Sequence, residues 1–92
     1  MPKVKIELLA PFSELTEEPV FALNFKGPTR MKDVIDRIEK RVPGFMKKLL
    51  DEGVLKPGIT VLKDGININR DNLLSQVVDD CDLVFCILVS GG

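Results

Sequence analysis

Few side chains in this sequence could perform chemistry. The 92 residues include no His, which excludes Ser-His-Asp and Cys-His machinery and any zinc site built with imidazole. Cys81 and Cys86 are too few to form a structural zinc or iron–sulfur centre by themselves. The carboxylates of Asp79, Asp80 and Asp82 could offer oxygen ligands to a metal, but solvated carboxylates in a turn are far more common. We therefore expect no conventional small enzyme, no cofactor and no bound metal.

The two thiols are expected to stay reduced. Cys86 falls in an apolar segment, where a free cysteine usually acts as a small hydrophobic residue. Cys81 falls in an acidic turn, whose carboxylates disfavour the reactive thiolate. If residues 81–86 are extended, their Cα atoms lie about 16 Å apart at ~3.3 Å per residue, which is beyond the reach of a disulfide. A relay of sulfur through either thiol is the alternative interpretation.

The other group able to react is the main-chain carboxylate that follows Gly91 and Gly92. Small terminal residues are often merely disordered. Glycine lacks a Cβ, however, so two successive glycines can pass through a narrow channel and deliver their carboxylate into another enzyme's nucleotide site. There the carboxylate could be activated as an acyl-adenylate. Such chemistry needs no catalytic side chain, which agrees with the absence of His.

The elements that would position this carboxylate follow from the hydrophobic pattern. Residues 3–9 alternate, with Val4, Ile6 and Leu8 on one face, which predicts a half-buried strand. Residues 20–25 alternate in the same way. We expect the two strands to form an antiparallel hairpin with a long polar connection.

A helix is predicted after Thr29, which is a suitable N-cap. The apolar residues that recur at helical spacing behind it are Met31, Val34, Ile35, Ile38 and Val42. Pro43 and Gly44 end this helix. A short second helix is expected over residues 45–52, with Gly53 closing it.

The period of two returns near residue 59. Residues 59–68 predict a hairpin whose Asp64-Gly65 pair suits a primed turn. Residues 71–78 predict a short turn or helical piece. Residues 83–89 are apolar throughout, which is typical of a central strand buried on both faces. We expect this strand to lie parallel to the first.

One main helix crossing a mixed sheet with a central last strand defines an α+β, ubiquitin-like β-grasp fold. The expected organisation is one β-grasp domain over residues 1–89, followed by a flexible tail at 90–92 that holds no core residue. The start of the sequence lacks the apolar stretch of a signal peptide, and no segment approaches the ~20 apolar residues of a membrane span. A cytoplasmic protein is therefore expected.

The charges are balanced overall but unevenly placed. Thirteen basic and 14 acidic residues leave a net charge of -1, so nucleic acid and anionic membrane are not expected as partners. Residues 30–48 carry a net +4, whereas residues 64–92 carry a net -4. The commonest explanation is a solvated helix face. The alternative is that the acidic C-terminal part steers the protein toward basic partner surfaces.

The sequence resembles the MoaD/ThiS sulfur carriers, most closely the small subunit of molybdopterin synthase. The resemblance covers nearly the whole chain. Its segments are residues 15–16, 29–41, 43–45, 61–68 and 79–84, together with the ending Val89-Ser90-Gly91-Gly92, which is the most specific part. That branch usually has Phe-Pro-Pro before its Val-Ser-Gly-Gly ending. Here Cys86-Ile87-Leu88 replaces it, which should let the last strand continue further because proline would end strand pairing.

The resemblance implies a protein co-substrate rather than an enzyme. An adenylating enzyme of the ubiquitin-activating type would convert Gly92 to an acyl-adenylate, and sulfur would replace the adenylate to give a thiocarboxylate. Gly91 would provide passage through the channel. The thiocarboxylate would donate its sulfur in a synthase large subunit or another acceptor. The pathway that the resemblance implies is molybdenum cofactor biosynthesis. The partner would dock on the sheet face and the last strand.

Three alternatives remain open from the sequence. The protein could be a ubiquitin-like modifier joined to lysines through Gly92, since the same adenylation serves both roles. It could carry sulfur for thiamine or for tRNA thiolation. It could also be a β-grasp nucleic-acid or scaffolding module whose tail is idle.

Overall fold

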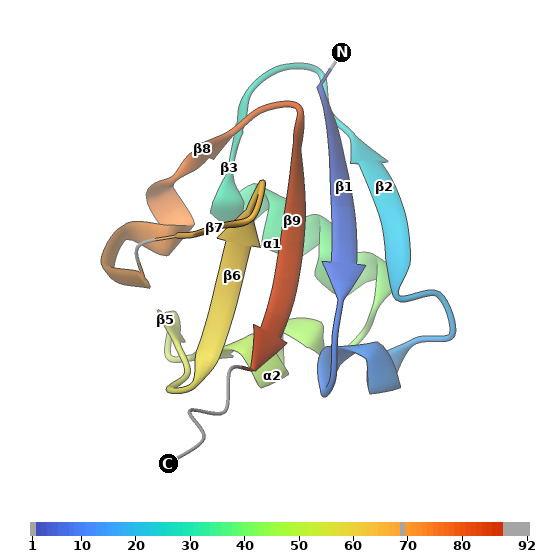
Figure 1. The fold of residues 1–92 in the computed structure, drawn as a ribbon, viewed down its shortest axis with the longest axis vertical. Coiled ribbons are helices and arrows are strands. Elements are labelled where there is room, and N and C mark those ends of the chain that lie inside the picture. Colours follow the sequence, from blue (N-terminus) through green and yellow to red (C-terminus); the bar gives the residue numbers. More distant parts are fainter. Residues whose placement is uncertain (1, 69, 88–92) are drawn as a thin grey trace.

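The first and last strands lie side by side in the middle of a mixed sheet (Figure 1). The computed structural model describes residues 2–68 and 70–87. Five strands form this sheet in the order β2-β1-β9-β6-β7. Their bounds are β1 Lys3–Leu8, β2 Val20–Asn24, β6 Ile59–Lys63, β7 Ile66–Asn67 and β9 Cys81–Ile87.

The register of the sheet confirms the predicted pairings. β1 and β2 are antiparallel, with Ile6 opposite Phe21. β1 and β9 are parallel, with Ile6 opposite Leu83, and β9 is antiparallel to β6 on its other side. Between β6 and β7, Asp64 and Gly65 both have positive φ, at 50° and 83°, as a type I′ turn requires. The central strand therefore has a neighbour on each side along most of its length.

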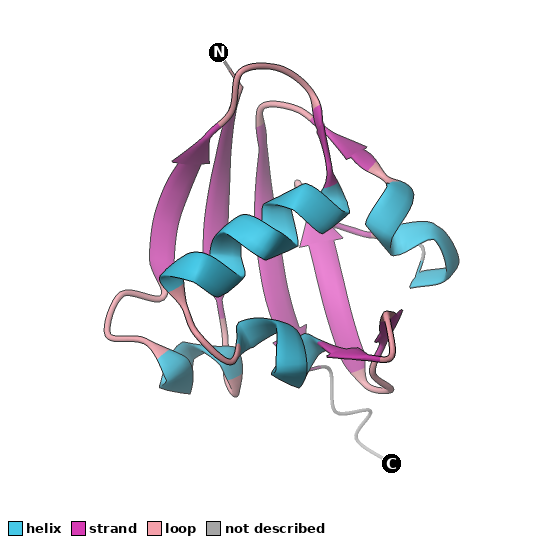
Figure 2. Cartoon of the chain, turned by 180° about the vertical axis from the view of Figure 1, so that it is seen from behind, coloured by secondary structure: helices cyan, strands magenta, loops and turns pink. Residues whose placement is uncertain are grey.

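One helix, α1 (Met31–Arg41), crosses a single face of the sheet (Figure 2). The predicted apolar stripe of α1 faces the sheet and is fully buried, and Ile38 has 0% of its surface exposed. The apolar side of α1 thus supplies the core with its helix layer, because burial of this stripe removes it from water.

The start of α1 differs from the prediction. Thr29 is not the N-cap: it belongs to β3 (Thr29–Arg30), which pairs with β8 (Val77–Val78). Arg30 holds the cap position without a side-chain hydrogen bond. The amide of Met31 instead donates to the carbonyl of Gln76 at 2.8 Å. A distant backbone segment therefore satisfies the helix end that a local side chain was expected to satisfy.

The second helix is also shorter than expected. α2 spans Phe45–Leu49 and gives way to a small hairpin formed by β4 (Leu50–Asp51) and β5 (Val54–Leu55). Gly53, with φ +80°, lies in the turn of this hairpin and does not close the helix. The remaining helices in the described ranges are the 3₁₀ helices η1 (Phe12–Leu15) and η2 (Arg70–Ser75).

A side chain on α1 supports the start of α2. The Glu39 carboxylate accepts hydrogen bonds from the amides of Gly44 at 3.0 Å and Met46 at 2.7 Å. These amides belong to the first turn of α2, which has no intrahelical acceptor for them. Glu39 therefore holds the two helices in a fixed relation at the end of the molecule where the chain leaves β9 (Figures 1 and 2).

Candidate functional site

The point where the chain leaves the central strand is the first candidate site. The Leu9 amide donates to the Phe85 carbonyl at 3.0 Å, after which the chain that follows β1 turns away. β6 stays paired further, with Ile59 opposite Ile87. Residues 86–87 are therefore flanked by one strand only, and we call this segment the exit. β9 thus extends through Ile87, the first of the two positions at which the branch that the sequence resembles has proline.

The exit is apolar and partly exposed. Within the exit, Cys86 is buried and Ile87 is 40% exposed, and Leu9, which follows the neighbouring β1, is 42% exposed. Gly92, the predicted reactive residue, and Gly91, the predicted passage residue, lie outside the described residues, as do Leu88 and Val89 of the predicted strand. The described part of the chain therefore ends at Ile87, before the predicted tail.

Three aromatic rings support the strand just before the exit. The rings of Phe45 and Phe85 meet edge to face with centroids 5.1 Å apart, and Phe12 lies 5.4 Å from Phe45. All three side chains are fully buried. They come from η1, α2 and β9, so this cluster packs both short helices against the central strand. The exit consequently begins from a rigid support.

The second candidate site is the face of the sheet opposite α1, which we call the open face. Here the prediction of a strand buried on both faces is wrong. Asp82 is exposed and Val84 is half-buried, because only one helix layer covers the sheet. Leu62 of β6 lies opposite Val84, and the exposed Lys5 of β1 lies opposite Asp82. An apolar centre flanked by charges therefore faces outward.

The cysteines do not form a reactive pair. The prediction that Cys81 lies in a turn is wrong, because Cys81 is the first residue of β9. Both thiols are free and buried. Burial raises the pKa of the Cys81 thiol, and the charge of Asp64 raises it further. Burial also raises the pKa of Cys86, whose Sγ lies 3.8 Å from the Thr60 carbonyl oxygen. Both thiolates are disfavoured, so a sulfur relay through them is poorly supported.

The acidic residues lie at the opposite end of β9 from the exit. The amide of Asp82 donates to Asp64 Oδ1 at 2.9 Å, and the amide of Lys3 donates to Asp80 Oδ1 at 2.8 Å. Within residues 2–68 and 70–87, no cluster of three potential ligands could hold a metal ion. Asp82 and Ile87 are five residues apart, or about 17 Å at ~3.4 Å per residue. Asp64, Asp80 and Asp82 thus lie away from the exit.

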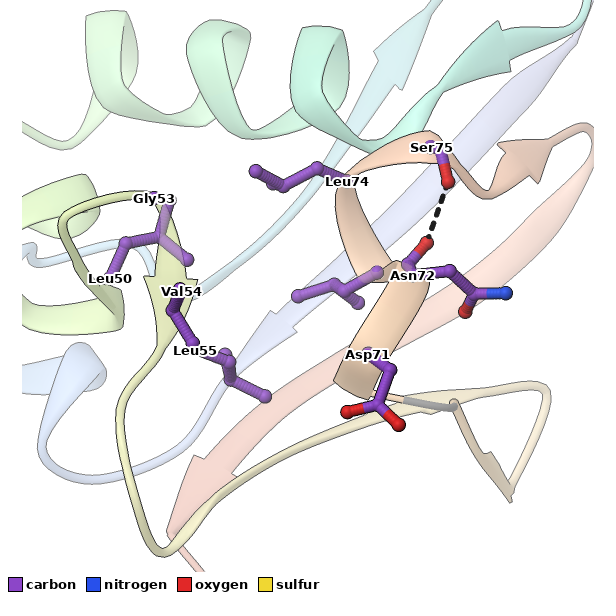
Figure 3. A pocket seen from close by; sticks show the side chains of 9 residues that line it. Leu50, Gly53, Val54, Leu55, Asp71, Asn72, Leu74 and Ser75 are labelled. Carbon is purple, nitrogen blue, oxygen red and sulfur yellow. Dashed lines mark hydrogen bonds between the residues drawn. The ribbon is translucent and has the colours of Figure 1, made fainter.

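A groove lies between η2 and the β4–β5 hairpin (Figure 3). Its volume is about 400 Å³. Apolar side chains such as Val54 and Leu74 line it, and Asp71 is the one ionisable residue among those that do. Both oxygens of Asn72 accept hydrogen bonds: its backbone carbonyl accepts from Ser75 Oγ at 3.1 Å and its Oδ1 accepts from Gln76 Nε2 at 2.8 Å. This groove therefore offers no acid–base pair.

The described helices include none long and apolar enough to cross a membrane. The order of strands and the single crossing helix define an α+β protein with the ubiquitin-like β-grasp fold.

Solved structures share this fold along the whole chain. Small archaeal modifier protein 1 of Methanosarcina acetivorans is 24% identical, with a TM-score of 0.76 over 100% of this chain and 98% of that chain. A chain of the BexX/CysO complex of Amycolatopsis orientalis is 24% identical, with a TM-score of 0.77 over 97% of this chain and 99% of that chain. A Pyrococcus furiosus protein described as molybdopterin converting factor subunit 1 is 22% identical, with a TM-score of 0.70 over 97% and 100%.

All three of these structural neighbours are less than 25% identical to this chain. No protein-family model matches the sequence, and no curated protein matches it either. At such identities the likeness establishes the fold.

Sequence reasoning missed several residues that shape these sites. Glu39, Arg37 and Arg41 were visible only as charges on a solvated helix face. Glu39 lies five residues before Gly44 and seven before Met46, whose amides donate hydrogen bonds to its carboxylate. This short spacing was the one local sign of its role, since an acidic side chain stabilises the N-terminus of a helix.

Proposed function

We propose that this protein is a ubiquitin-like sulfur carrier of the MoaD/ThiS type, and that the carboxylate of Gly92 carries the sulfur. The observation that carries the proposal is the course of β9. This apolar strand occupies the middle of the sheet, rests on a buried aromatic cluster and leaves the sheet at an exit flanked by one strand. A carrier needs such an arrangement, because a rigid domain must present a terminal segment to other proteins.

The proposed chemistry takes place in partner enzymes. An oxygen of the Gly92 carboxylate attacks the α-phosphorus of ATP in an adenylating enzyme of the ubiquitin-activating type, and pyrophosphate leaves. A sulfide-level sulfur donor then attacks the acyl carbon and AMP leaves. The thiocarboxylate so formed gives its sulfur to an acceptor enzyme. Gly91 allows the tail to pass the constricted entrance, and the protein acts as a co-substrate.

The open face is the proposed docking surface for these enzymes. Burying the half-exposed Val84 and Leu62 in an interface would stabilise it at roughly 25 cal/mol per Å² of apolar area removed from water. Exposed Lys5 and Asp82, which lie opposite each other, would fix the orientation of the partner through charge.

The pathway we propose is molybdopterin synthesis in the cytoplasm, with a synthase large subunit as acceptor. The sequence resemblance and the likeness to a protein described as molybdopterin converting factor subunit 1 support it. A second candidate is conjugation to protein lysines through Gly92, which the likeness to small archaeal modifier proteins favours. Sulfur transfer in thiamine synthesis or tRNA thiolation uses the same carrier chemistry and is compatible with the same site.

Intact-mass spectrometry of the protein isolated from its native cells tests the proposal. A carrier should show a fraction whose mass rises by the exchange of one oxygen for sulfur, and treatment with a thiol-alkylating reagent should modify that fraction at the C-terminus. Isopeptide-linked conjugates without any sulfur exchange would favour the modifier instead. The absence of both products in cells that express the partner enzymes would contradict the proposal.

A further inference from the structure

Strand β2 forms one edge of the sheet, and no helix or strand of the described residues lies beyond it (Figures 1 and 2). Leu8 donates its amide to the Pro19 carbonyl at 2.8 Å, and Phe25 donates to the Pro2 carbonyl at 3.0 Å. This register turns the backbone groups of residues 19, 21, 23 and 25 toward β1. The amide and carbonyl groups of Val20 and Ala22 consequently point away from the sheet. In the described part of the chain these four groups have no hydrogen-bond partner.

This edge lacks the usual protection against pairing. Natural edge strands are commonly blocked by an inserted lysine, a proline or a bulge. β2 contains none of these, since its sequence is VFALN and its pairing with β1 is regular. Val20 is 51% exposed and Ala22 is exposed beside it. The edge is therefore available as a template for another strand.

Two arginines of α1 lie along the helix side of this edge. The guanidinium of Arg37 is 4.9 Å from the Phe25 ring centroid, with Nη2 3.4 Å from the Asn24 carbonyl oxygen. The guanidinium of Arg41 is 4.5 Å from the Phe21 ring centroid and 3.2 Å from Glu18 Oε2. Both arginines are nevertheless exposed. Stacking on the rings orients each guanidinium, so its remaining donors are presented in a fixed geometry.

We propose that the β2 edge binds an extended segment of a partner protein as an added strand, with acidic side chains toward α1 and small aliphatic side chains toward the open face. Backbone groups of Val20 and Ala22 would pair with the segment. Alternate side chains of a strand point to opposite faces, so every second residue would reach Arg37 or Arg41. This surface is two strands away from the exit and goes beyond sulfur carriage.

The charges argue for a partner segment over a second copy of the chain. If two copies paired antiparallel about Ala22, each would bring Arg37 and Arg41 toward the same pair of the other. Residues 30–48 carry a net +4, so this contact would place like charges together. An acidic segment meets the same surface with opposite charge, and its carboxylates can form charge-assisted hydrogen bonds with the guanidinium groups.

A peptide of alternating Val and Glu is the probe for this edge. Titrated into isotope-labelled protein, it should shift the amide NMR signals of Val20 and Ala22 most strongly. The same peptide with N-methylated backbone amides should lose binding, because it cannot complete the ladder. A peptide of alternating Val and Lys should not bind. Equal binding of the N-methylated peptide, or shifts centred on Val84, would overturn the proposal.

Charge variants separate this edge from general electrostatic attraction. The double change Arg37→Gln and Arg41→Gln should weaken binding of the Val-Glu peptide by about tenfold, whereas Lys40→Gln, at another exposed position of α1, should change the affinity less than about twofold. Glu18→Gln should strengthen binding, because it frees Arg41 from its present partner. An equal loss in the Lys40→Gln variant, or dimerisation of the protein through β2, would overturn the proposal.

Discussion

The two ends of β9 differ in what surrounds them. At its beginning, Cys81 and Leu83 are buried, β1 and β6 flank the strand, and Asp64 and Asp82 exchange hydrogen bonds across it. At its end, β1 has turned away and Ile87 is partly exposed. One end of β9 is paired on both sides, whereas residues 86–87 at the other end are paired with β6 alone. A carrier needs both properties, because its reactive terminus must move while its docking surface stays fixed.

The largest expected effect concerns burial on either side of the exit. Phe85→Ala removes a buried ring that contacts Phe45 and should lower the free energy of unfolding by about 3–5 kcal/mol. Ile87→Ala, only two residues further, should lower it by no more than about 1 kcal/mol because that side chain is already 40% exposed. Chemical denaturation measures both. Similar losses in the two variants would remove the difference between strand and exit.

A smaller effect is expected from the helix connection near the exit. Glu39→Ala removes the acceptor of the Gly44 and Met46 amides and should lower the free energy of unfolding by about 1–2 kcal/mol. Asp36→Ala, at an exposed position on the same helix, should change it by less than about 0.5 kcal/mol. Amide hydrogen exchange should also quicken in α2 of the Glu39 variant alone. Unchanged exchange there would show that Glu39 does not support this end.

The turn at the other end of β9 gives a third comparison. Gly65→Ala should lower the free energy of unfolding by about 1 kcal/mol, because a residue with a Cβ is strained at φ +83°. An added Cβ would have no atom within 4 Å, so this backbone strain is the whole expected effect. Gly27→Ala meets equally open space without a positive φ. Thermal unfolding should therefore leave the Gly27 variant near the parent. A stabilised Gly65 variant would contradict the type I′ turn.

The smallest expected effect is the pH dependence of the buried thiols. Their pKa values are raised above the ordinary 9.0, chiefly by burial, so above this pH the unfolded chain loses thiol protons that the folded chain retains. The thiol contribution to the free energy of unfolding is complete below pH 9.0 and falls as the pH rises further. A double Cys81→Ala, Cys86→Ala variant should show a shallower decline above pH 9.0. Parallel declines would mean that the thiols titrate normally in the folded protein.

The sequence was sufficient for the parts of the fold that repeat a simple period. Alternation identified β1, β2 and β6, and the helical stripe identified α1 with Ile38 at its buried centre. The Asp64-Gly65 turn also followed from local chemistry, since few residues accept a positive φ. These features are determined by residues close to one another in the sequence, so the sequence alone is enough to predict them.

The rest depended on contacts between distant segments. Thr29 was a reasonable N-cap from the local sequence, but it lies in β3, where it pairs with Val78 of β8. Cys81 stood among acidic residues, yet the parallel register with β1 placed it in the core. The apolar sequence of β9 gave no sign that one face would stay open, because continuous hydrophobicity does not state how many layers cover a sheet. The candidate site was predicted as a terminus with docking on the sheet face and the last strand, but which residues of that face stay exposed depended on the assembled sheet.

Activation of matched tail variants tests the central claim most directly. Parent protein, Gly91→Val and a Gly92 deletion would each be incubated with ATP, the adenylating enzyme and a sulfur source, and pyrophosphate release and intact mass would be measured. The parent should release pyrophosphate and exchange one oxygen for sulfur.

Gly91→Val should keep the parent's thermal midpoint but lose activation, because a β-branched side chain narrows the allowed backbone conformations and obstructs the channel. The deletion should abolish sulfur transfer, since even about 1 Å of misplacement can lower a rate about a hundredfold. Equal sulfur uptake by all three proteins would contradict the carrier role of Gly92.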